Sequence, residues 1–363
     1  MKRLQGIRVS ADFIKAHHHV CDLVNSEYPI LSLVTDGRAN WLYLWCDTDG
    51  SRHRWLLFRT TRELLVEYLD KKNPLLKLVT ESTKLLALDE GAITYADAGT
   101  SRKKLTKRLL KRVSLEDVSD YLPADDSYFD EELTRDLDLT KQIVPSLYDL
   151  PIDGSWFGKD FEHLFKRYER VYAFFYATRP QFVTTIGGIL ERCLRAPWMG
   201  GASRVHLYSQ LAQQIPAIHS LRVKHLAYGS PGAIRFEALP SIGESIAKTT
   251  TSFIENEDAI ARHFDCIQKI LTNANLRSED LSAVADASVP LNDDKKSELK
   301  DACASIATVL DVESEFAALV HHSPNVVVFS KAVQSFVRQL TLLAAFQADD
   351  MVKFSPEAHA NIS

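Results

Sequence analysis

Residues 41–47 read WLYLWCD, and this short segment decides the fold of the N-terminal part of the chain. Aromatic residues at every second position alternate with leucines and a cysteine, so both faces of the segment are apolar. Successive side chains of a strand point to opposite faces of its sheet, and a strand that is apolar on both faces is typical of a sheet covered on both sides. We therefore expect 41–47 to be a central strand.

The flanking segments extend this strand into a meander. YPILSLVT (28–35) and RWLLFRT (54–60) are also rich in branched and aromatic residues, and the turn sequences Asp36-Gly37 and Asp47-Thr-Asp-Gly50 separate them from 41–47. Further along the chain, the spacing of apolar residues predicts other elements. They are a helix at 60–72, a short helix after Pro74, and a strand pair formed by 83–89 and 92–98.

The rest of the chain changes in character. Residues 123–155 are acidic and contain several prolines, which predicts a connector, whereas the sequence from Trp156 onward has mainly helical spacing. We therefore predict an α+β protein with an antiparallel sheet and one or two helices in its N-terminal domain, followed by a mainly helical part that contains a β-hairpin. The predicted boundaries are 1–122 for the N-terminal domain, 123–155 for the acidic connector, and 156–363 for the helical domain with hairpin 221–239.

The turn of that hairpin, Gly229-Ser-Pro-Gly232, first suggests a phosphate-binding loop or a nucleophile turn. A phosphate-binding loop needs a helix directly after it, whereas the following AIRFEAL alternates like a strand, and Pro231 removes an N–H donor. A nucleophile turn needs the G-x-S-x-G spacing, which Ser230 does not have. The glycines and the proline instead favour a hairpin turn.

Composition bounds the function only loosely. The chain has 363 residues, a net charge of −5 and 45% hydrophobic residues, which is ordinary for a soluble protein and gives no general attraction to nucleic acid or to anionic membranes. The five cysteines are scattered, which is typical of a reducing compartment. No stretch has the roughly 18 uncharged apolar residues of a membrane helix, since Lys331 and Arg338 interrupt 326–346. We expect a cytoplasmic protein without a membrane span.

One basic run suggests nucleic acid. Seven cationic residues and no acid lie within 102–112, and such a run can neutralise phosphates. The favoured interpretation is a solvated face, or one paired with the ten acids of 116–138. The candidate nucleic-acid-binding residues are Arg102, Lys103, Lys104, Lys107, Arg108, Lys111 and Arg112.

A second candidate surface combines the aromatic segment 156–176 with the hairpin tip. Aromatic residues near the start of a helical domain usually belong to its core, but an excess of them also suits an interface with a partner or with a second copy of the chain. The candidate partner-binding residues are Trp156, Phe157, Phe174, Tyr228, Ser230 and Pro231.

The evidence for catalysis or metal binding is weaker. His17-His18-His19 and His321-His322 resemble metal ligands, but three consecutive histidines on a helix point about 100° apart and no complete ligand set accompanies them. Glu298-Leu-Lys300 has the spacing of a nuclease motif but lies in a helical pattern, and Glu81-Ser-Thr-Lys84 has the wrong spacing. We assign no catalytic residue, metal ligand or cofactor, and keep a nuclease or other hydrolase with dispersed catalytic residues as an alternative.

Four segments carry a resemblance. WLYLWCDTDGSRHRWLLFRTT followed by YLPADDSYFD, and RVHLYSQLAQQIP with LRVKHLAYGSPGAIRFEAL, resemble uncharacterised bacterial proteins with an N-terminal α+β module and a helical C-terminal part. The resemblance implies an association with anti-phage defence and carries no catalytic residue with it. The sequence thus favours a non-enzymatic recognition or assembly protein, a sensor or adaptor with a protein partner or self-association. Nucleic-acid binding through 102–112 is the first alternative.

Overall fold

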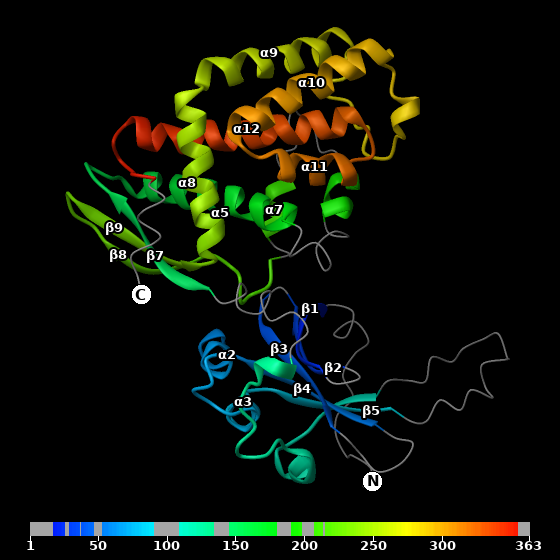
Figure 1. The fold of residues 1–363 in the computed structure, drawn as a ribbon, viewed down its shortest axis with the longest axis vertical. Coiled ribbons are helices and arrows are strands. Elements are labelled where there is room, and N and C mark those ends of the chain that lie inside the picture. The colour runs from blue at the N-terminus through cyan, green and yellow to red at the C-terminus, as the bar shows by residue number, and fades with distance from the viewer. Residues whose placement is uncertain are drawn as a thin grey trace, which may run out of the picture. The chain divides into compact units, whose positions relative to one another are not determined.

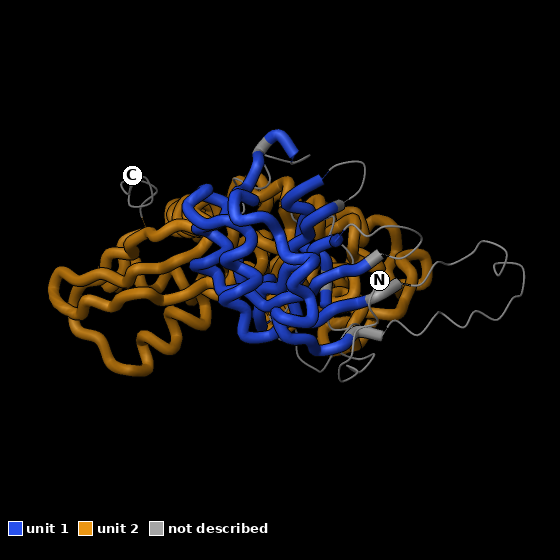
Figure 2. Tube along the Cα trace, turned by 90° about the horizontal axis from the view of Figure 1, so that it is seen from below, with its two compact units in different colours: residues 1–144, 216–218 blue, residues 145–215, 219–363 orange. Residues whose placement is uncertain are grey.

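The chain folds as an α+β protein with two compact units, which Figure 2 shows in separate colours. Unit 1 comprises residues 1–144 and 216–218, and unit 2 comprises residues 145–215 and 219–363. The computed structural model describes residues 17–25, 29–36, 38–46, 53–90, 109–133, 145–179, 190–197, 207–212 and 215–354.

Within the described residues, unit 1 contains a six-stranded antiparallel sheet whose strand order follows the chain, β1-β2-β3-β4-β5-β6 (Figure 1). The predicted meander is confirmed, and the second strand of the predicted 83–98 pair lies outside the described residues. The strands are β1 (His18–Asn25), β2 (Pro29–Thr35), β3 (Asn40–Cys46), β4 (His53–Thr60), β5 (Leu85–Glu90) and β6 (Leu109–Arg112), and the helical elements are α2 (Arg62–Leu69), α3 (Leu75–Thr80), η2 (Glu116–Tyr121) and η3 (Glu131–Leu133).

Strand β3 is apolar on both faces, as its alternation predicts. On one face Leu42 and Leu44 belong to a buried cluster that also contains Leu65 of α2 and Leu78 of α3. On the opposite face Trp41 belongs to a second buried cluster, formed with residues of the neighbouring strands. Helices α2 and α3 therefore lie against only one of the two apolar faces of the sheet.

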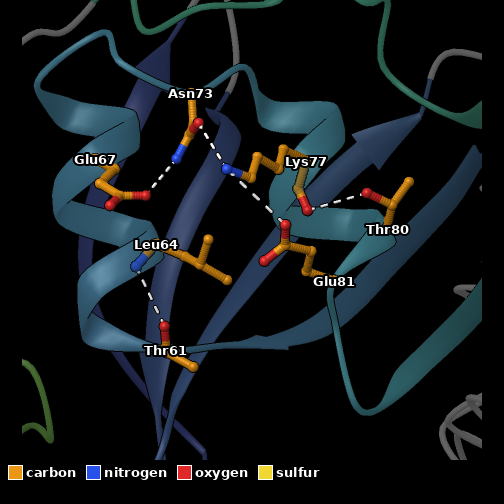
Figure 3. Close-up of polar contacts among 7 residues, drawn as sticks. All are labelled: Thr61, Leu64, Glu67, Asn73, Lys77, Thr80 and Glu81. Carbon is orange, nitrogen blue, oxygen red and sulfur yellow. Dashed lines mark hydrogen bonds and ion pairs between the residues drawn. The ribbon is translucent and has the colours of Figure 1, made fainter.

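A chain of polar contacts holds the two short helices together (Figure 3). The amide of Asn73 donates to the carboxylate of Glu67, and its oxygen accepts from Lys77 Nζ at 3.0 Å. Lys77 Nζ also lies 3.9 Å from the carboxylate of Glu81, and the Thr61 hydroxyl caps α2 by accepting a backbone N–H at 3.2 Å. Glu67, Asn73 and Lys77 fix the turn between the helices, whereas Thr61 caps the start of α2.

The turn between β2 and β3 depends on the carboxylate of Asp36. It accepts hydrogen bonds from the backbone N–H of Arg38 (2.9 Å), from that of Ala39 (2.8 Å) and from the indole of Trp41 (3.2 Å). Burial opposes ionisation of Asp36, but these hydrogen bonds favour it and lower its pKa below the usual value.

Replacing Asp36 by asparagine is expected to destabilise unit 1 by about 1 kcal/mol at pH 7, because charge-assisted hydrogen bonds become neutral ones. A carboxylate with a lowered folded-state pKa stabilises the protein above its unfolded pKa of about 3.9, and this contribution is lost as the pH falls through the folded-state pKa. Urea unfolding at pH 7 and pH 3 should therefore show a difference between wild type and variant that shrinks in acid. Asp125→Asn, at an exposed carboxylate, is the control. A difference of the same size at both pH values would contradict this account.

The histidines near the start of the described chain lie on a strand. The helical spacing considered for His17-His18-His19 is wrong, because residues 18–25 pair with β2 as strand β1. His19 Nε2 lies 2.8 Å from a carboxylate oxygen of Asp22. Among the described residues, no group of three or more histidine, cysteine or acidic side chains is arranged to hold a metal ion.

The part of unit 2 that the structure describes contains a three-stranded antiparallel sheet in the order β7-β9-β8, together with a set of packed helices (Figure 1). Its strands are β7 (Ser146–Ile152), β8 (Arg222–Ala227) and β9 (Gly232–Ala238). Its helical elements are α5 (Gly158–Thr178), α7 (Leu207–Ala212), α8 (Pro240–Glu255), α9 (Glu257–Asn273), η4 (Asp286–Ser288), α10 (Asp293–Leu310), α11 (Glu313–His322) and α12 (Val326–Ala348).

The hairpin predicted at 221–239 is confirmed as β8 and β9. The third strand, β7, lies in the predicted connector 123–155 and pairs with β9 from Ser146 to Ile152. Pro151 had favoured an irregular segment, yet a proline is tolerated on an outer strand, where its missing N–H removes no ladder bond to β9. Earlier in the same range, Phe129 is buried against Tyr68 in the core of unit 1. The predicted connector therefore contributes to the folded parts of both units.

Helix α12 is the most buried helix of unit 2. It is long and apolar enough to cross a membrane by composition, but 83% of its most apolar window is buried inside the protein. Phe336 on this helix stacks on Phe174 of α5 with ring centroids 3.9 Å apart. The apolar residues of α12 thus form the centre of the core, which is typical of a soluble-type fold.

Candidate partner-binding surface

The hairpin tip is tied to the loop that precedes α5. The Ser230 hydroxyl donates to the carboxylate of Asp153, which also accepts the backbone N–H of Gly154 at 2.7 Å, and these two hydrogen bonds lower the pKa of Asp153 below its usual value. A side chain at Gly232 would place its Cβ 2.5 Å from the carbonyl oxygen of Ala227, so only glycine fits this turn. The tip is therefore a defined structure rather than a free loop.

Trp156 packs beside the hairpin tip and holds it through ring contacts and hydrogen bonds. Its ring stacks on Phe161 (4.7 Å between centroids) and on Phe346 of α12 (5.7 Å), and its indole N–H donates to the carbonyl oxygen of Asp153 at 2.8 Å. Its backbone N–H donates to the hydroxyl oxygen of Tyr228 at 3.2 Å. Trp156 is almost fully buried, so it positions the surface and does not offer a ring to a partner.

Four large apolar side chains around this anchor are exposed. The exposed fraction is 76% for Phe157, 59% for Tyr228, 46% for Val223 and 41% for Leu226. We name these four residues the hairpin surface. Phe157 is the N-cap residue of α5, and its backbone N–H donates to Asp160 at 2.7 Å, which holds the backbone in place while the ring extends into solvent.

The strand register explains why Val223 and Leu226 are exposed. Val223 pairs with Phe236 and Leu226 pairs with Ile234, and residues directly opposite each other in an antiparallel pair share one face. Phe236 and Ile234 are fully buried, and Phe236 stacks on Tyr168 of α5 at 5.0 Å. Strand β8 therefore extends the core-facing side of the sheet beyond the cover of the helices.

The charges around β8 are mainly basic. The strand carries Arg222, Lys224 and His225, and Lys224 lies 3.1 Å from the carboxylate of Glu237 on β9. In the order β7-β9-β8 it is a terminal strand of the described sheet. A terminal strand with exposed apolar residues and basic character suits the addition of a further strand of opposite charge.

The structure separates the six candidate partner-binding residues. It brings Phe157, Tyr228, Ser230 and Pro231 together as exposed residues, with Trp156 beneath them. Phe174 is a correction, because it is completely buried between Phe336, Phe175 and Phe316. Its place off the main apolar stripe of α5 suggested an interface, but helices on more than one side of α5 cover it.

Val223 and Leu226 belong to the candidate surface and were not named from the sequence. They lie three positions apart in RVKHLA, which is not the two-residue period of a regular strand. An irregularity in the β8–β9 register between Val223 and His225 places both on the core-facing side, so the sequence pattern gives no direct signal for this shared face. Whether a helix covers that strand depends on the lengths and positions of segments far away in the chain. Ile234 on β9 is buried, whereas its cross-strand partner Leu226 on β8 is exposed, so the cover of the sheet ends between these two strands.

Most of the predicted basic run lies outside the described residues, including Arg102, Lys103, Lys104, Lys107 and Arg108. Lys111 and Arg112 lie on strand β6, where they pair with Ala87 and Leu86. Adjacent residues on a strand point to opposite faces, so these two cations do not form one stripe. Nucleic-acid binding through 102–112 stays a prediction.

The segments considered for hydrolysis serve structural roles. Glu298 accepts from Lys295 Nζ at 2.5 Å, while Lys300, two residues further along helix α10, points about 200° away. Glu81 contacts Lys77, whereas Lys84 Nζ lies 5.5 Å from the centre of the Trp41 ring. Neither pair therefore brings an acid and a lysine together as a nuclease motif requires.

The remaining histidine pair lies at the end of α11. The rings of His321 and His322 are 4.8 Å apart, and burial together with the neighbouring His321 lowers the pKa of His322 below its usual value. Both effects favour the neutral imidazole of His322.

Comparison of the chain with protein-family models, with the curated proteins and with solved structures gave no match.

Proposed function

We propose that this protein is a non-enzymatic recognition or assembly protein that binds an extended polypeptide segment at the hairpin surface. The supporting observation is that Phe157, Tyr228, Val223 and Leu226 are exposed. Trp156, next to Phe157, is held in place by its hydrogen bonds to Tyr228 and to the backbone of Asp153. Exposed apolar groups that gather in one place are typical of interaction sites, and aromatic residues dominate the energetics of such interfaces. The predicted setting, a cytoplasmic sensor or adaptor in bacterial anti-phage defence, is part of this proposal.

The proposed partner segment is acidic and apolar in alternation. Strand addition at β8 places apolar side chains of the partner near Val223 and Leu226, and acidic ones near Arg222, Lys224 and His225. Pairing of two copies of β8 would bring basic residues close to basic residues, which is unfavourable. Charge therefore favours a different polypeptide over a second copy of the chain.

Peptide binding tests this proposal directly. Fluorescence anisotropy is measured with three labelled peptides in which valine alternates with glutamate, lysine or serine. We expect the glutamate peptide to bind at least about tenfold more tightly than the lysine peptide, a difference of about 1.4 kcal/mol. Replacing Leu226 by serine should weaken binding of the glutamate peptide by a similar factor.

The chain offers a matched control. Leu342 on α12 is exposed to 44%, close to the 41% of Leu226, and Leu342→Ser should leave peptide binding unchanged. Equal binding of the three peptides, or equal losses in both variants, would refute the proposal. If the protein instead forms a concentration-dependent dimer that Leu226→Ser abolishes, the hairpin surface binds a second copy of the chain and not the proposed peptide.

A further inference from the structure

A separate cavity lies at the other end of unit 2, between helices α10 and α11 and the start of α12. Its volume is about 520 Å³. Small-molecule sites in proteins usually span roughly 300–1,000 Å³ and are mainly apolar, with a few polar groups that orient the ligand. The cavity has both the size and the character of such a site.

Small residues on facing helices create this space. Ala304 and Ala307 of α10 face it from one side, and Ala317 of α11 faces it from another. Phe316 and Phe329 line it with aromatic surface, their ring centroids 6.3 Å apart and their planes nearly perpendicular. Since alanine side chains are too short to fill the gap between two helices, an apolar hollow remains.

The acidic groups of the lining are already stabilised. A carboxylate oxygen of Asp286 accepts the backbone N–H of Val326 at 2.8 Å, at the N-terminus of α12. Glu313 is the first residue of α11, where the helix dipole favours a negative charge. Neither acid requires a cationic ligand.

Two other polar groups of the lining lack partners among the described residues. Lys300 is the basic residue of the lining, is exposed at the mouth, and makes no ion pair with any described acid. The hydroxyl oxygen of Ser323 is buried and has no hydrogen-bond partner. Because that oxygen is closed off from the cavity as well as from solvent, the Lys300 ammonium is the polar group of the lining that decides which ligand the cavity takes.

We propose that this cavity binds a small amphipathic carboxylate, with its apolar body against Phe316 and Phe329. The carboxylate group of the ligand pairs with Lys300, the basic residue of the lining. The site is formed by α10, α11 and α12, whereas the proposed peptide site is formed by the hairpin and α5, so the two proposals stand independently.

The test uses the full chain and three probes of equal chain length: octanoate, octylamine and octanol. Isothermal titration calorimetry should show saturable binding of octanoate, with octylamine weaker by at least about tenfold. Lys300→Met should weaken octanoate binding about tenfold, and Lys300→Arg should retain most of it. Lys269→Met, at an exposed lysine of α9 outside the lining, should change nothing.

Substitutions that fill the cavity are the second part of the test. Ala304→Leu should abolish octanoate binding, and Ala317→Leu, on the facing helix α11, should do the same if the first variant does not fold. Leu226→Ser should leave octanoate binding intact, which separates this cavity from the hairpin surface. Octylamine binding as tightly as octanoate, or octanoate binding that survives both filled variants, would overturn the proposal.

Discussion

Replacing Phe174 by alanine is expected to lower the free energy of unfolding of unit 2 by about 3–5 kcal/mol, the usual cost of removing a fully buried phenylalanine. The ring stacks on Phe336 at 3.9 Å and contacts Phe175 and Phe316 edge to face. Its removal leaves a cavity that the packed helices of unit 2 cannot close. Urea unfolding, followed by circular dichroism at 222 nm as a measure of helix content, gives the value.

Phe157 provides the matched control for this substitution. It is the N-cap residue of the same helix, α5, but is exposed to 76%, so Phe157→Ala should change the unfolding free energy by less than about 0.5 kcal/mol. The same variant should weaken binding of the glutamate peptide. A loss below about 1 kcal/mol for Phe174→Ala would contradict its assignment to the core.

Asn325 gives the second large effect. Its side-chain oxygen caps α12 by accepting the backbone N–H of Val328 at 2.9 Å, and its amide donates to the carbonyl oxygens of Leu281 and Val284, both at 2.8 Å. The residue is almost fully buried. Asn325→Ala should therefore cost about 2–4 kcal/mol, because a cap is lost and the two carbonyls lose their donor.

Aspartate at the same position distinguishes the two roles. Asn325→Asp keeps the capping oxygen but replaces the donor amide by a charged acceptor beside two carbonyl oxygens, so it should be at least as harmful as alanine. Asn292 is the control, since it caps α10 through the N–H of Lys295 at 3.0 Å and is exposed. There alanine should cost about 1 kcal/mol, and aspartate should be neutral or slightly stabilising. Similar effects of aspartate at both positions would contradict the role of the buried amide.

Local patterns predicted much of the fold because they depend on neighbours in the chain. The alternation of 41–47 and the turn residues beside it identify the strands of the meander, and the same reasoning identifies the hairpin at 221–239. Strand β7 was not recognised, because Pro151 and the acidic residues before it are equally typical of a connector. Its pairing with β9 is a contact between segments more than seventy residues apart, which no local signal contains.

The candidate surface shows the same division. Phe157 and Phe174 both belong to the aromatic segment 156–176, and both were assigned to the partner-binding surface from the sequence. One is exposed and the other is buried because α12, far along the chain, packs on α5 where Phe174 lies. The cavity beside Lys300 likewise depends on how α10 and α11 meet.

By itself, the sequence determined strands β2, β3 and β4, the hairpin turn and the mainly helical character of the C-terminal part, because periodicity sets the direction in which each side chain leaves the backbone. Only the tertiary structure decided which of those side chains meet another element and which meet solvent. Burial depends on the packing of distant segments, and that packing is settled by the free energy of the whole core rather than by any one stretch.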